Sequence, residues 1–261
     1  MKKTLLNRIP NDMPHDIQRF VSGANIYDTS CSPKAKVYFI DKGNGYYLKC
    51  SDRGMLEKES QMTEYFYSKG FGAEVLNYIS NNSDWLLTTA VIGEDCVHER
   101  YLMDPKRLCD TIAYELRKLH ETDYSDCPIP DRTAEYLAGA EKNYCTGNYH
   151  KSHFPDRFGY RSAKEAYDVL VAGKDALQSK VLLHGDYCLP NIILNNWNLS
   201  GFIDVGNGGV GDRHIDIFWG VWSLGFNLKT NKYHERFLDA YGRDKADESI
   251  LKIVAAAEVF G

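Results

Sequence analysis

The sequence predicts an α+β fold in which a strand-rich first third precedes a mostly helical remainder. Short β-rich runs bounded by turn residues occupy the chain as far as about residue 91. Beyond residue 104, apolar residues recur at intervals of three and four, which is the spacing of buried amphipathic helices. The length of 261 residues suits one large domain or two small lobes. We therefore place the domain boundary where the strands give way to helices, with residues 1–91 in the first lobe and 92–261 in the second.

The first third is expected to contain two pairs of strands with one helix between the pairs. Val37–Ile40 and Tyr46–Cys50 flank a glycine-containing turn that is typical of a hairpin. Met55–Lys69 has apolar residues on one face and predicts a helix. Val75–Ser80 and Trp85–Ala90 predict two further strands.

The remainder of the chain is expected to be helical. Asp104-Pro105 is a good helix start, an N-cap residue followed by proline at the first helical position, and the helix should run to about His120. Further helices are expected at 161–178, Asp212–Leu228, Lys232–Tyr241 and Asp247–Phe260.

Composition excludes several classes of protein. A formal net charge of −5 gives no broad basic field, so nucleic acid is not an expected partner. No apolar run is long enough for a membrane helix, and the N-terminus lacks the features of a signal peptide. The seven cysteines are scattered and form no C-x-x-C pair, which indicates a reducing compartment. We therefore expect a cytoplasmic protein.

One stretch, residues 181–204, concentrates the polar residues that carry chemistry. Val181–Leu183 predicts a strand, and His184-Gly185-Asp186 opens a loop directly after it. Ile192–Leu194 and Ser200–Ile203 predict the arms of a hairpin. If the two arms pair with Ile193 opposite Phe202, Asn191 and Asp204 face one another at the hairpin mouth, where the loop also brings Asp186.

These three side chains suggest phosphoryl transfer. Carboxylate and amide oxygens are ligands that Mg²⁺ accepts, and the ion is usually held by one or two protein groups together with substrate phosphates. Asn191 and Asp204 are the candidate magnesium ligands. Asp186 then remains free to orient a hydroxyl group and accept its proton, which is the division of labour in kinase-type reactions.

The same residues carry a resemblance to a known family. His184-Gly185-Asp186, four residues, Asn191, twelve residues and Asp204 resemble the catalytic signature of aminoglycoside phosphotransferases, and Ile203-Asp204-Val205-Gly206 resembles the family's I-D-x-G motif. The segment 122–128 resembles the 3′-aminoglycoside kinase branch. The resemblance implies a two-lobed protein-kinase-like fold of the α+β class, with one helix in the strand-rich lobe.

The resemblance also implies roles in the first lobe. Lys49 resembles the strand lysine that contacts the nucleotide phosphates. Glu59 stands where the family's helix glutamate pairs with that lysine, and Glu57 is an alternative. Tyr47 matches a tyrosine that stacks on adenine. Further residues implied to bind nucleotide are Ser32, in a loop over the phosphates, and Thr89 and Val91, through their backbones.

In the second lobe the resemblance is less complete. The branch has an acidic drug-binding loop, whereas residues 145–160 hold one carboxylate and several basic residues. Its acidic pair is also absent near Phe226 and Asn227, and its arginine position holds Asn207. Glu258 and the carboxylate of Gly261 match groups that bind the drug's ammonium groups. Asp216 is expected to brace the catalytic loop from beneath.

The implied function is transfer of the ATP γ-phosphate to a hydroxyl of an aminoglycoside, of the 3′ type, with resistance as the result. GTP is a possible replacement for ATP. The alternatives are a kinase of another hydroxyl compound, such as choline, a macrolide or a metabolite, and a degenerate nucleotide-binding protein. We expect a small-molecule substrate, no membrane partner, and a monomer or weak dimer.

Overall fold

The computed structural model describes residues 3–6, 13–31, 35–150 and 159–261, and the chain divides into two units. Unit 1 comprises Met1–Glu94 and Ile193–Gly206, and unit 2 comprises Asp95–Ile192 and Asn207–Gly261. The first division lies three residues beyond the boundary expected from the sequence. The segment 193–206 belongs to unit 1, although it was assigned by sequence to the second lobe.

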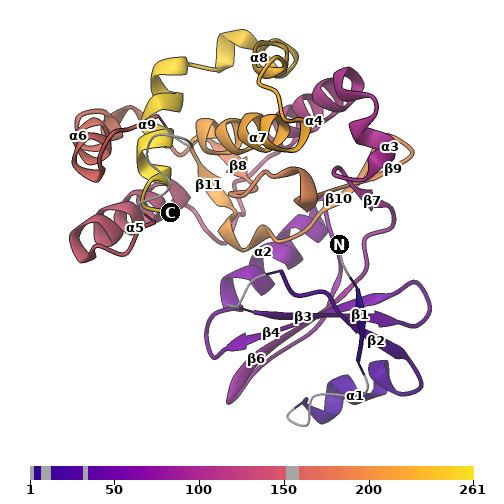
Figure 1. Cartoon of the computed structure of the whole chain (residues 1–261). Coiled ribbons are helices and arrows are strands. Elements are labelled where there is room, and N and C mark those ends of the chain that lie inside the picture. The colour runs from indigo at the N-terminus through magenta and orange to yellow at the C-terminus, as the bar shows by residue number, and fades with distance from the viewer. Residues whose placement is uncertain (1–2, 7–12, 32–34, 151–158) are drawn as a thin grey trace. The chain divides into compact units, whose positions relative to one another are not determined.

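Unit 1 contains a six-stranded antiparallel sheet in the order β1-β2-β3-β4-β6-β5 (Figure 1). Its strands are β1 (Thr4–Leu5), β2 (Asn25–Asp28), β3 (Lys36–Asp41), β4 (Tyr46–Asp52), β5 (Val75–Ser80) and β6 (Ser83–Thr89). The last four were expected from the sequence. The short strands β1 and β2 were not, because their residues show no alternating pattern of sufficient length.

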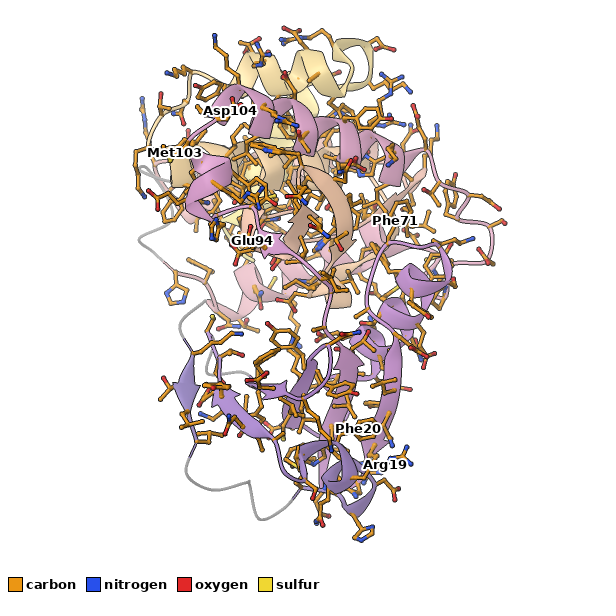
Figure 2. The ribbon with its side chains drawn as sticks, turned by 90° about the vertical axis from the view of Figure 1, so that its right-hand side faces the viewer. Arg19, Phe20, Phe71, Glu94, Met103 and Asp104 are labelled. Carbon is orange, nitrogen blue, oxygen red and sulfur yellow. The ribbon has the colours of Figure 1, made fainter. Side chains whose placement is uncertain are left out.

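Two helices lie on opposite sides of this sheet (Figure 1). Helix α1 (His15–Val21) covers one face, where Ile17 packs in a cluster with Ile40 and Leu48. Its Arg19 guanidinium lies 4.8 Å from the ring centre of Phe20, and both residues are labelled in Figure 2. Helix α2 (Glu57–Ser68) belongs to the other side. Because side chains alternate along a strand, Leu48 faces α1 and Lys49 faces α2.

Strands β9 (Ile192–Asn195) and β10 (Asn198–Phe202) form the hairpin expected from the sequence. The hairpin reaches the main part of unit 1 through Phe202, whose N–H donates to the carbonyl of Phe71 at 2.6 Å. Residues Asn196 and Trp197 at its tip both have positive φ, as the tight turn requires. The hairpin leads directly to Asp204.

Unit 2 is mainly helical (Figure 1). Its larger helices are α4 (Pro105–His120), α5 (Arg132–Thr146), α6 (Ala163–Gly173), α7 (Arg213–Leu228), α8 (His234–Tyr241) and α9 (Glu248–Glu258). The short elements are β7 (Glu94–Asp95), which spans the division, α3 (Glu99–Leu102), β8 (Val181–Leu183) and β11 (Gly209–Gly211). Helix α9 packs against α6 and α7, and α4 packs against α7 and α8.

Helix starts in unit 2 follow the expected capping chemistry. Asp104, next to Met103 in Figure 2, accepts the N–H of Arg107, and Pro105 is the first residue of α4. Helix α5 was not expected from the sequence. It is capped by Asp131 and ends at Gly147, but it buries only Thr133 and Ala140 and so lacks a clear apolar stripe.

Strand β8 positions the loop that follows it. It pairs antiparallel with β11, with Leu183 opposite Gly209. Val181 and Leu183 are buried in a cluster with Ile215 of α7 and Val254 of α9. The loop that begins with His184-Gly185-Asp186 therefore follows a strand that pairs with β11 and packs against residues of α7 and α9. In the part of the chain that the structure describes, no helix has the length and apolar character needed to cross a membrane.

Candidate active site

In unit 1, Lys49 of β4 is bound by two carboxylates. Its Nζ donates to Oε1 and Oε2 of Glu59, at 2.8 and 2.7 Å, and to Oδ1 of Asp204, at 2.8 Å. Of the two glutamates considered from the sequence, Glu59 is therefore the partner, while Glu57 is exposed at the start of α2. Asp204 is separated from Lys49 by 155 residues, and the β9–β10 hairpin brings it here.

Burial and charge act in opposite directions on this network. Burial lowers the pKa of Lys49, but the negative charges of Glu59 and Asp204 outweigh it and leave the pKa raised. Burial raises the pKa of Glu59, and the Lys49 charge offsets this only in part. The ammonium is therefore charged at neutral pH. The Asp204 side chain is 52% exposed, compared with 14% for Glu59, so Asp204 is the more accessible carboxylate.

The I-D-x-G segment has a local backbone reason for its residue types. Asp204 has a φ of +60°, a left-handed conformation that aspartate tolerates better than most residues. A Cβ at Gly206 would lie 3.1 Å from Cβ of Glu59, closer than an ordinary contact. Glycine at 206 therefore allows the segment to pass close to α2, on which Glu59 lies.

Three further nucleotide-binding candidates of unit 1 lie among the described residues, and a fourth does not. Tyr47 lies on the same face as Lys49, with its ring centre 5.2 Å from that of Phe39. The Thr89 N–H donates to the carbonyl of Glu74, whereas Val91 makes no backbone hydrogen bond among the described residues. Ser32 lies outside the described residues.

In unit 2, Asp186 and Asn191 form a pair. The Asn191 Nδ2 donates to the carbonyl oxygen of Asp186 and to its Oδ2, both at 3.0 Å. Asn191 ends a 3₁₀ turn, Leu189–Asn191, which folds the loop back on Asp186. Since both contacts use the amide nitrogen, the amide oxygen of Asn191 points away from these bonds and is a candidate metal ligand.

Asp216 of α7 clamps the backbone beneath this loop. Its side chain is fully buried and accepts the N–H of His184 at 2.7 Å and the N–H of Gly185 at 2.8 Å. The expected bracing role of Asp216 is confirmed by these two bonds. His184 adds a third restraint, because its Nδ1 accepts the Asp186 N–H at 3.2 Å.

A chain of buried hydrogen bonds supports Asp216 from α4 and α8. Burial lowers the pKa of His120, so its ring is neutral at pH 7. Its Nε2 donates to Asp216 at 3.2 Å, and its Nδ1 accepts the Tyr241 hydroxyl at 2.8 Å. Arg213 donates to the same hydroxyl oxygen at 3.4 Å. No role was assigned to His120 from the sequence.

Gly185 is required by a close approach of two backbones. It has a φ of +82°, and a Cβ at this position would lie 1.9 Å from the carbonyl oxygen of Asn207. The loop that contains Asp186 thus packs directly on the residue that follows the I-D-x-G segment.

Arg132 of α5 is a residue of this region that was missed in the sequence. Its Nε donates to the carbonyl of Asn207 at 2.8 Å and its Nη2 to the Asn207 side chain at 3.2 Å. The family resemblance implied an arginine as residue 207. Here residue 207 is asparagine, and the guanidinium of Arg132 lies against it instead. Arg132 lies 75 residues away in sequence, so no local motif marks it.

Glu258 and Gly261, the substrate-binding candidates, lie together at the end of α9. The Glu258 Oε1 accepts the Tyr136 hydroxyl at 2.8 Å and the Trp219 Nε1–H at 3.0 Å. Burial raises the pKa of Glu258 to about 7, although these two hydrogen bonds lower it in part and the Asp186 charge raises it further. A Cβ at Gly261 would lie 2.8 Å from Glu258 Oε2.

The oxygen atoms of Asn191 and Asp204 are of the type that magnesium binds. Asn191 offers an amide oxygen and Asp204 an exposed carboxylate oxygen, both hard ligands. Among the described residues there is no group of three or more His, Cys, Asp or Glu side chains that could hold a metal.

Replacing Glu59 by glutamine is expected to weaken ATP binding and turnover by about 10- to 100-fold, because Lys49 loses its buried anchor. The matched control is Glu57→Gln on the same helix, two residues away and exposed. Its effect on the Kd for ATP and on kcat/KM should stay within about twofold. Equal effects of the two substitutions would remove Glu59 from this role.

A kinase-type phosphotransferase is expected to have a lysine held by a carboxylate and an Asp–Asn pair on a fixed loop. Unit 1 contains such a lysine, held by two carboxylates, and unit 2 contains such a pair. The protein-family model described as "Phosphotransferase enzyme family" (APH) matches residues 34–251. The chain belongs to this family, and the family assignment made from the sequence is confirmed.

Individual relatives agree with this assignment. The chain is 49% identical over 249 residues to a "Probable aminoglycoside 3′-phosphotransferase" of Lactococcus lactis, covering 95% of each protein. It is 31% identical over 241 residues to an aminoglycoside 3′-phosphotransferase of Escherichia coli, covering 88% of this chain and 84% of the relative.

Solved structures agree in fold. A crystal structure of aminoglycoside-3′-phosphotransferase of type VIII matches with a TM-score of 0.78 at 22% identity, covering 95% of this chain and 100% of that one. Aminoglycoside phosphotransferase APH(3″)-Id from Streptomyces rimosus, in complex with ADP and streptomycin, matches with a TM-score of 0.72 at 22% identity, covering 86% and 90%. The expected α+β protein-kinase-like fold is confirmed.

Proposed function

We propose that this protein is an ATP-dependent aminoglycoside 3′-phosphotransferase that transfers the γ-phosphate to a sugar hydroxyl. The observation that carries the phosphotransfer chemistry is the binding of Lys49 by both Glu59 and Asp204. The substrate class is supported by the 49% identity to the Lactococcus lactis relative over nearly the whole chain.

The nucleotide is assigned to unit 1. Lys49, held by Glu59, directs its ammonium group toward the α- and β-phosphates. Tyr47 stacks on adenine, and the backbones of Thr89 and Val91 offer hydrogen bonds to its edge. Ser32 contributes to the loop over the phosphates. The bound ADP in the Streptomyces rimosus structure supports a nucleotide site in this fold. GTP is the alternative donor of the phosphate.

Asn191 and Asp204 are the proposed ligands of Mg²⁺. When bound, the ion neutralises charge on the phosphate oxygens and orients the transferred group. Asp204 also accepts a hydrogen bond from Lys49, so it links the residue that grips the phosphates to the metal. Asn191 similarly links the metal to Asp186 through its amide nitrogen.

Asp186 is the proposed base. Its carboxylate accepts the hydrogen bond of the substrate hydroxyl, orients the oxygen toward the γ-phosphorus and takes up the proton as the new P–O bond forms. The bond between the γ-phosphorus and the bridging β-phosphate oxygen breaks in the same transfer, and ADP is the leaving group. The reaction asks the protein mainly for position and charge, so the clamp of Asp216 on the loop contributes by holding Asp186 in place.

A panel of acceptors tests the function. Purified protein with MgATP is offered an aminoglycoside that carries a 3′-hydroxyl, the matched 3′-deoxy compound, choline and a macrolide. We expect phosphorylation of the first only, together with resistance in a susceptible host that expresses the chain. Phosphorylation of choline or the macrolide alone would identify the other kinase class. ATP binding with no acceptor phosphorylated would identify a degenerate protein.

The raised pKa of Glu258 predicts how the stability of the protein changes with pH. A carboxyl whose folded pKa is about 7 is protonated below that pH, and its folded state binds more protons than the unfolded state between about pH 4.5 and 7. Stability is therefore lost as pH rises from about 4.5 to about 7, and the loss is complete above 7. Glu258→Gln removes the ionisable group but keeps an oxygen where Oε1 accepts both hydrogen bonds.

We expect Glu258→Gln to be close to wild type at pH 5 and more stable by about 1 to 3 kcal/mol at pH 8.5, measured by urea unfolding. If the Glu258 carboxylate also binds a substrate ammonium group, the wild-type KM for the acceptor falls as pH rises through 7, whereas the variant's KM does not. A stability difference that is independent of pH would contradict the raised pKa.

A further inference from the structure

Helix α2, which carries Glu59, begins without a capping side chain of its own. Its N-cap residue is Leu56, a buried apolar residue whose side chain offers no hydrogen bond. The first N–H groups of a helix have no partner within the helix, so a buried helix start needs a partner from elsewhere. Strand β6 provides one, because Asp84 Oδ2 accepts the Leu56 N–H at 2.8 Å. The cap of α2 therefore comes from the sheet.

Asp84 is a buried carboxylate that is held by hydrogen bonds. The residue is fully buried, which is rare for an aspartate unless it is paired. The Tyr78 hydroxyl of β5 donates to the same Oδ2 at 3.1 Å. Burial raises the pKa of Asp84, but accepted hydrogen bonds, led by that of the Leu56 N–H, outweigh burial and leave the pKa lowered. The carboxylate is therefore charged at neutral pH, at the positive end of the α2 dipole.

The bond from Asp84 joins α2 to the same face of the sheet that carries Lys49. Asp84 lies opposite Ser51 in the pairing of β6 with β4, and Ser51 and Lys49 share a face because side chains alternate along a strand. Glu59 follows Leu56 by three residues, a rise of about 4.5 Å along the helix. Less than one helical turn thus separates the capped N–H from the carboxylate that holds Lys49 at 2.7 Å.

The first turn of α2 is closely fitted to its surroundings. A Cβ at Gly206 would lie 3.1 Å from Cβ of Glu59, so the segment that carries Asp204 passes close to this turn. Lys49 Nζ lies 2.8 and 2.7 Å from the two oxygens of Glu59. A shift of the turn by about 1 Å would lengthen these contacts beyond hydrogen-bond range. The position of α2 therefore decides whether the ion pair is made.

We propose that Asp84 is a positioning residue of the nucleotide site. Its carboxylate fixes the first turn of α2, this turn fixes Glu59, and Glu59 directs the Lys49 ammonium. The effect of Asp84 on ATP binding rests on the proposed function, in which Lys49 binds the phosphates. The effect of Asp84 on Lys49 itself does not depend on the nucleotide.

The first test is a double-mutant cycle on the Kd for MgATP. Asp84→Ala removes the acceptor and should raise the Kd about three- to thirtyfold in the wild-type background. In the Glu59→Gln background it should raise the Kd by less than about twofold, because the residue through which Asp84 acts has already lost its charge. Equal effects in the two backgrounds, or an unchanged Kd in a protein whose wild type binds MgATP, would overturn the proposal. Asp84→Val, which also lacks an acceptor, replaces Asp84→Ala if the alanine variant does not fold.

Two controls separate this cap from other effects on stability. Tyr78→Phe removes the second bond to Asp84 Oδ2 and leaves the bond from the Leu56 N–H, so the Kd should stay within about twofold of wild type. Asp104→Ala removes the cap of α4 in unit 2. It should lower the midpoint of urea unfolding without changing the Kd, because α4 does not carry Glu59. A Kd that follows the unfolding midpoint in all variants would show a general loss of structure and contradict the proposal.

Asp84→Asn tests whether the accepting oxygen is the atom that acts. Oδ2 accepts both the Leu56 N–H and the Tyr78 hydroxyl, and Oδ1 has no partner among the described residues. An amide can therefore place its oxygen where Oδ2 lies and keep both bonds. The Kd for MgATP should stay within about twofold of wild type. A loss as large as that of Asp84→Ala would contradict the capping role, and this comparison remains if no variant without an acceptor folds.

A second measurement needs no nucleotide. N-Acetoxysuccinimide acetylates only an unprotonated amine, so the rate at which it modifies Lys49, followed by peptide mass spectrometry, reports how firmly Glu59 holds the ammonium. We expect Asp84→Ala to raise this rate about three- to thirtyfold in the wild-type background and less than about twofold in the Glu59→Gln background. A wild type that does not bind MgATP would contradict the proposed function and leave this rate to decide the role of Asp84. A rate that Asp84→Ala does not change would overturn the proposal.

Discussion

Asp186→Asn is expected to lower kcat by about 10²- to 10⁴-fold while leaving the fold and the Kd for ATP unchanged. The amide that replaces the carboxylate keeps an oxygen to accept the Asn191 Nδ2, which lies 3.0 Å from Asp186 Oδ2. It cannot accept a proton at neutral pH. The loop should therefore keep its structure and lose only the base, which steady-state kinetics and an ATP titration measure together.

The matched control is Asp175→Asn, an exposed aspartate outside the loop, which should keep kcat within about twofold of wild type. Unchanged turnover in Asp186→Asn would remove Asp186 from the base role. A large loss of ATP affinity would indicate instead that Asp186 acts through the nucleotide.

Asp216→Ala is expected to destabilise the protein by about 3 to 5 kcal/mol, because it removes the acceptor of the His184 and Gly185 N–H groups and of the His120 ring. A chain of this size should then lose roughly 10 °C or more in Tm. Differential scanning calorimetry and urea unfolding measure the loss, and any folded fraction should have reduced kcat because the catalytic loop has lost its clamp.

Asp239→Ala provides the comparison. Asp239 is on α8 and pairs with Arg243 at the surface, where its side chain is 67% exposed. An exposed pair of this kind contributes about 0 to 1 kcal/mol. If the two alanine substitutions cost the same, the buried hydrogen bonds of Asp216 do not stabilise the loop as described.

The sequence predicts the parts of this protein that are local and periodic. The strand Tyr46–Cys50 follows from a short β-rich run beside a glycine-containing turn, and the structure has this strand and places its Lys49 against Glu59. The start of α4 follows from Asp104 and Pro105, whose capping chemistry acts within one turn. The strand before His184 and the hairpin after Asn191 likewise have short, bounded apolar runs.

The parts that the sequence did not predict depend on contacts between distant residues. Helix α5 has too few buried positions to show an apolar stripe, so its residues gave no periodic signal. Arg132 reaches Asn207 only because α5 is placed beside that segment. The return of residues 193–206 to unit 1 depends on a bond between Phe202 and Phe71, which no local pattern marks.

The substrate preference is the part of the function that the catalytic residues do not determine. The side chains exposed toward the end of α7 include the apolar Phe226, and Glu258 is a buried carboxylate with a pKa of about 7. Fewer fixed negative charges should favour acceptors that carry fewer ammonium groups, because each one needs a compensating charge. Comparing kcat/KM across aminoglycosides that differ in amino-group number measures this preference.

The proposed role of Asp186 is to activate an acceptor hydroxyl for attack on the ATP γ-phosphate. It is tested most directly by mass spectrometry of an aminoglycoside with a 3′-hydroxyl after incubation with MgATP and either the wild type or Asp186→Asn. We expect a singly phosphorylated product, modified at that hydroxyl, with the wild type and almost none with the variant. No product with the wild type, or equal product with both proteins, would contradict it.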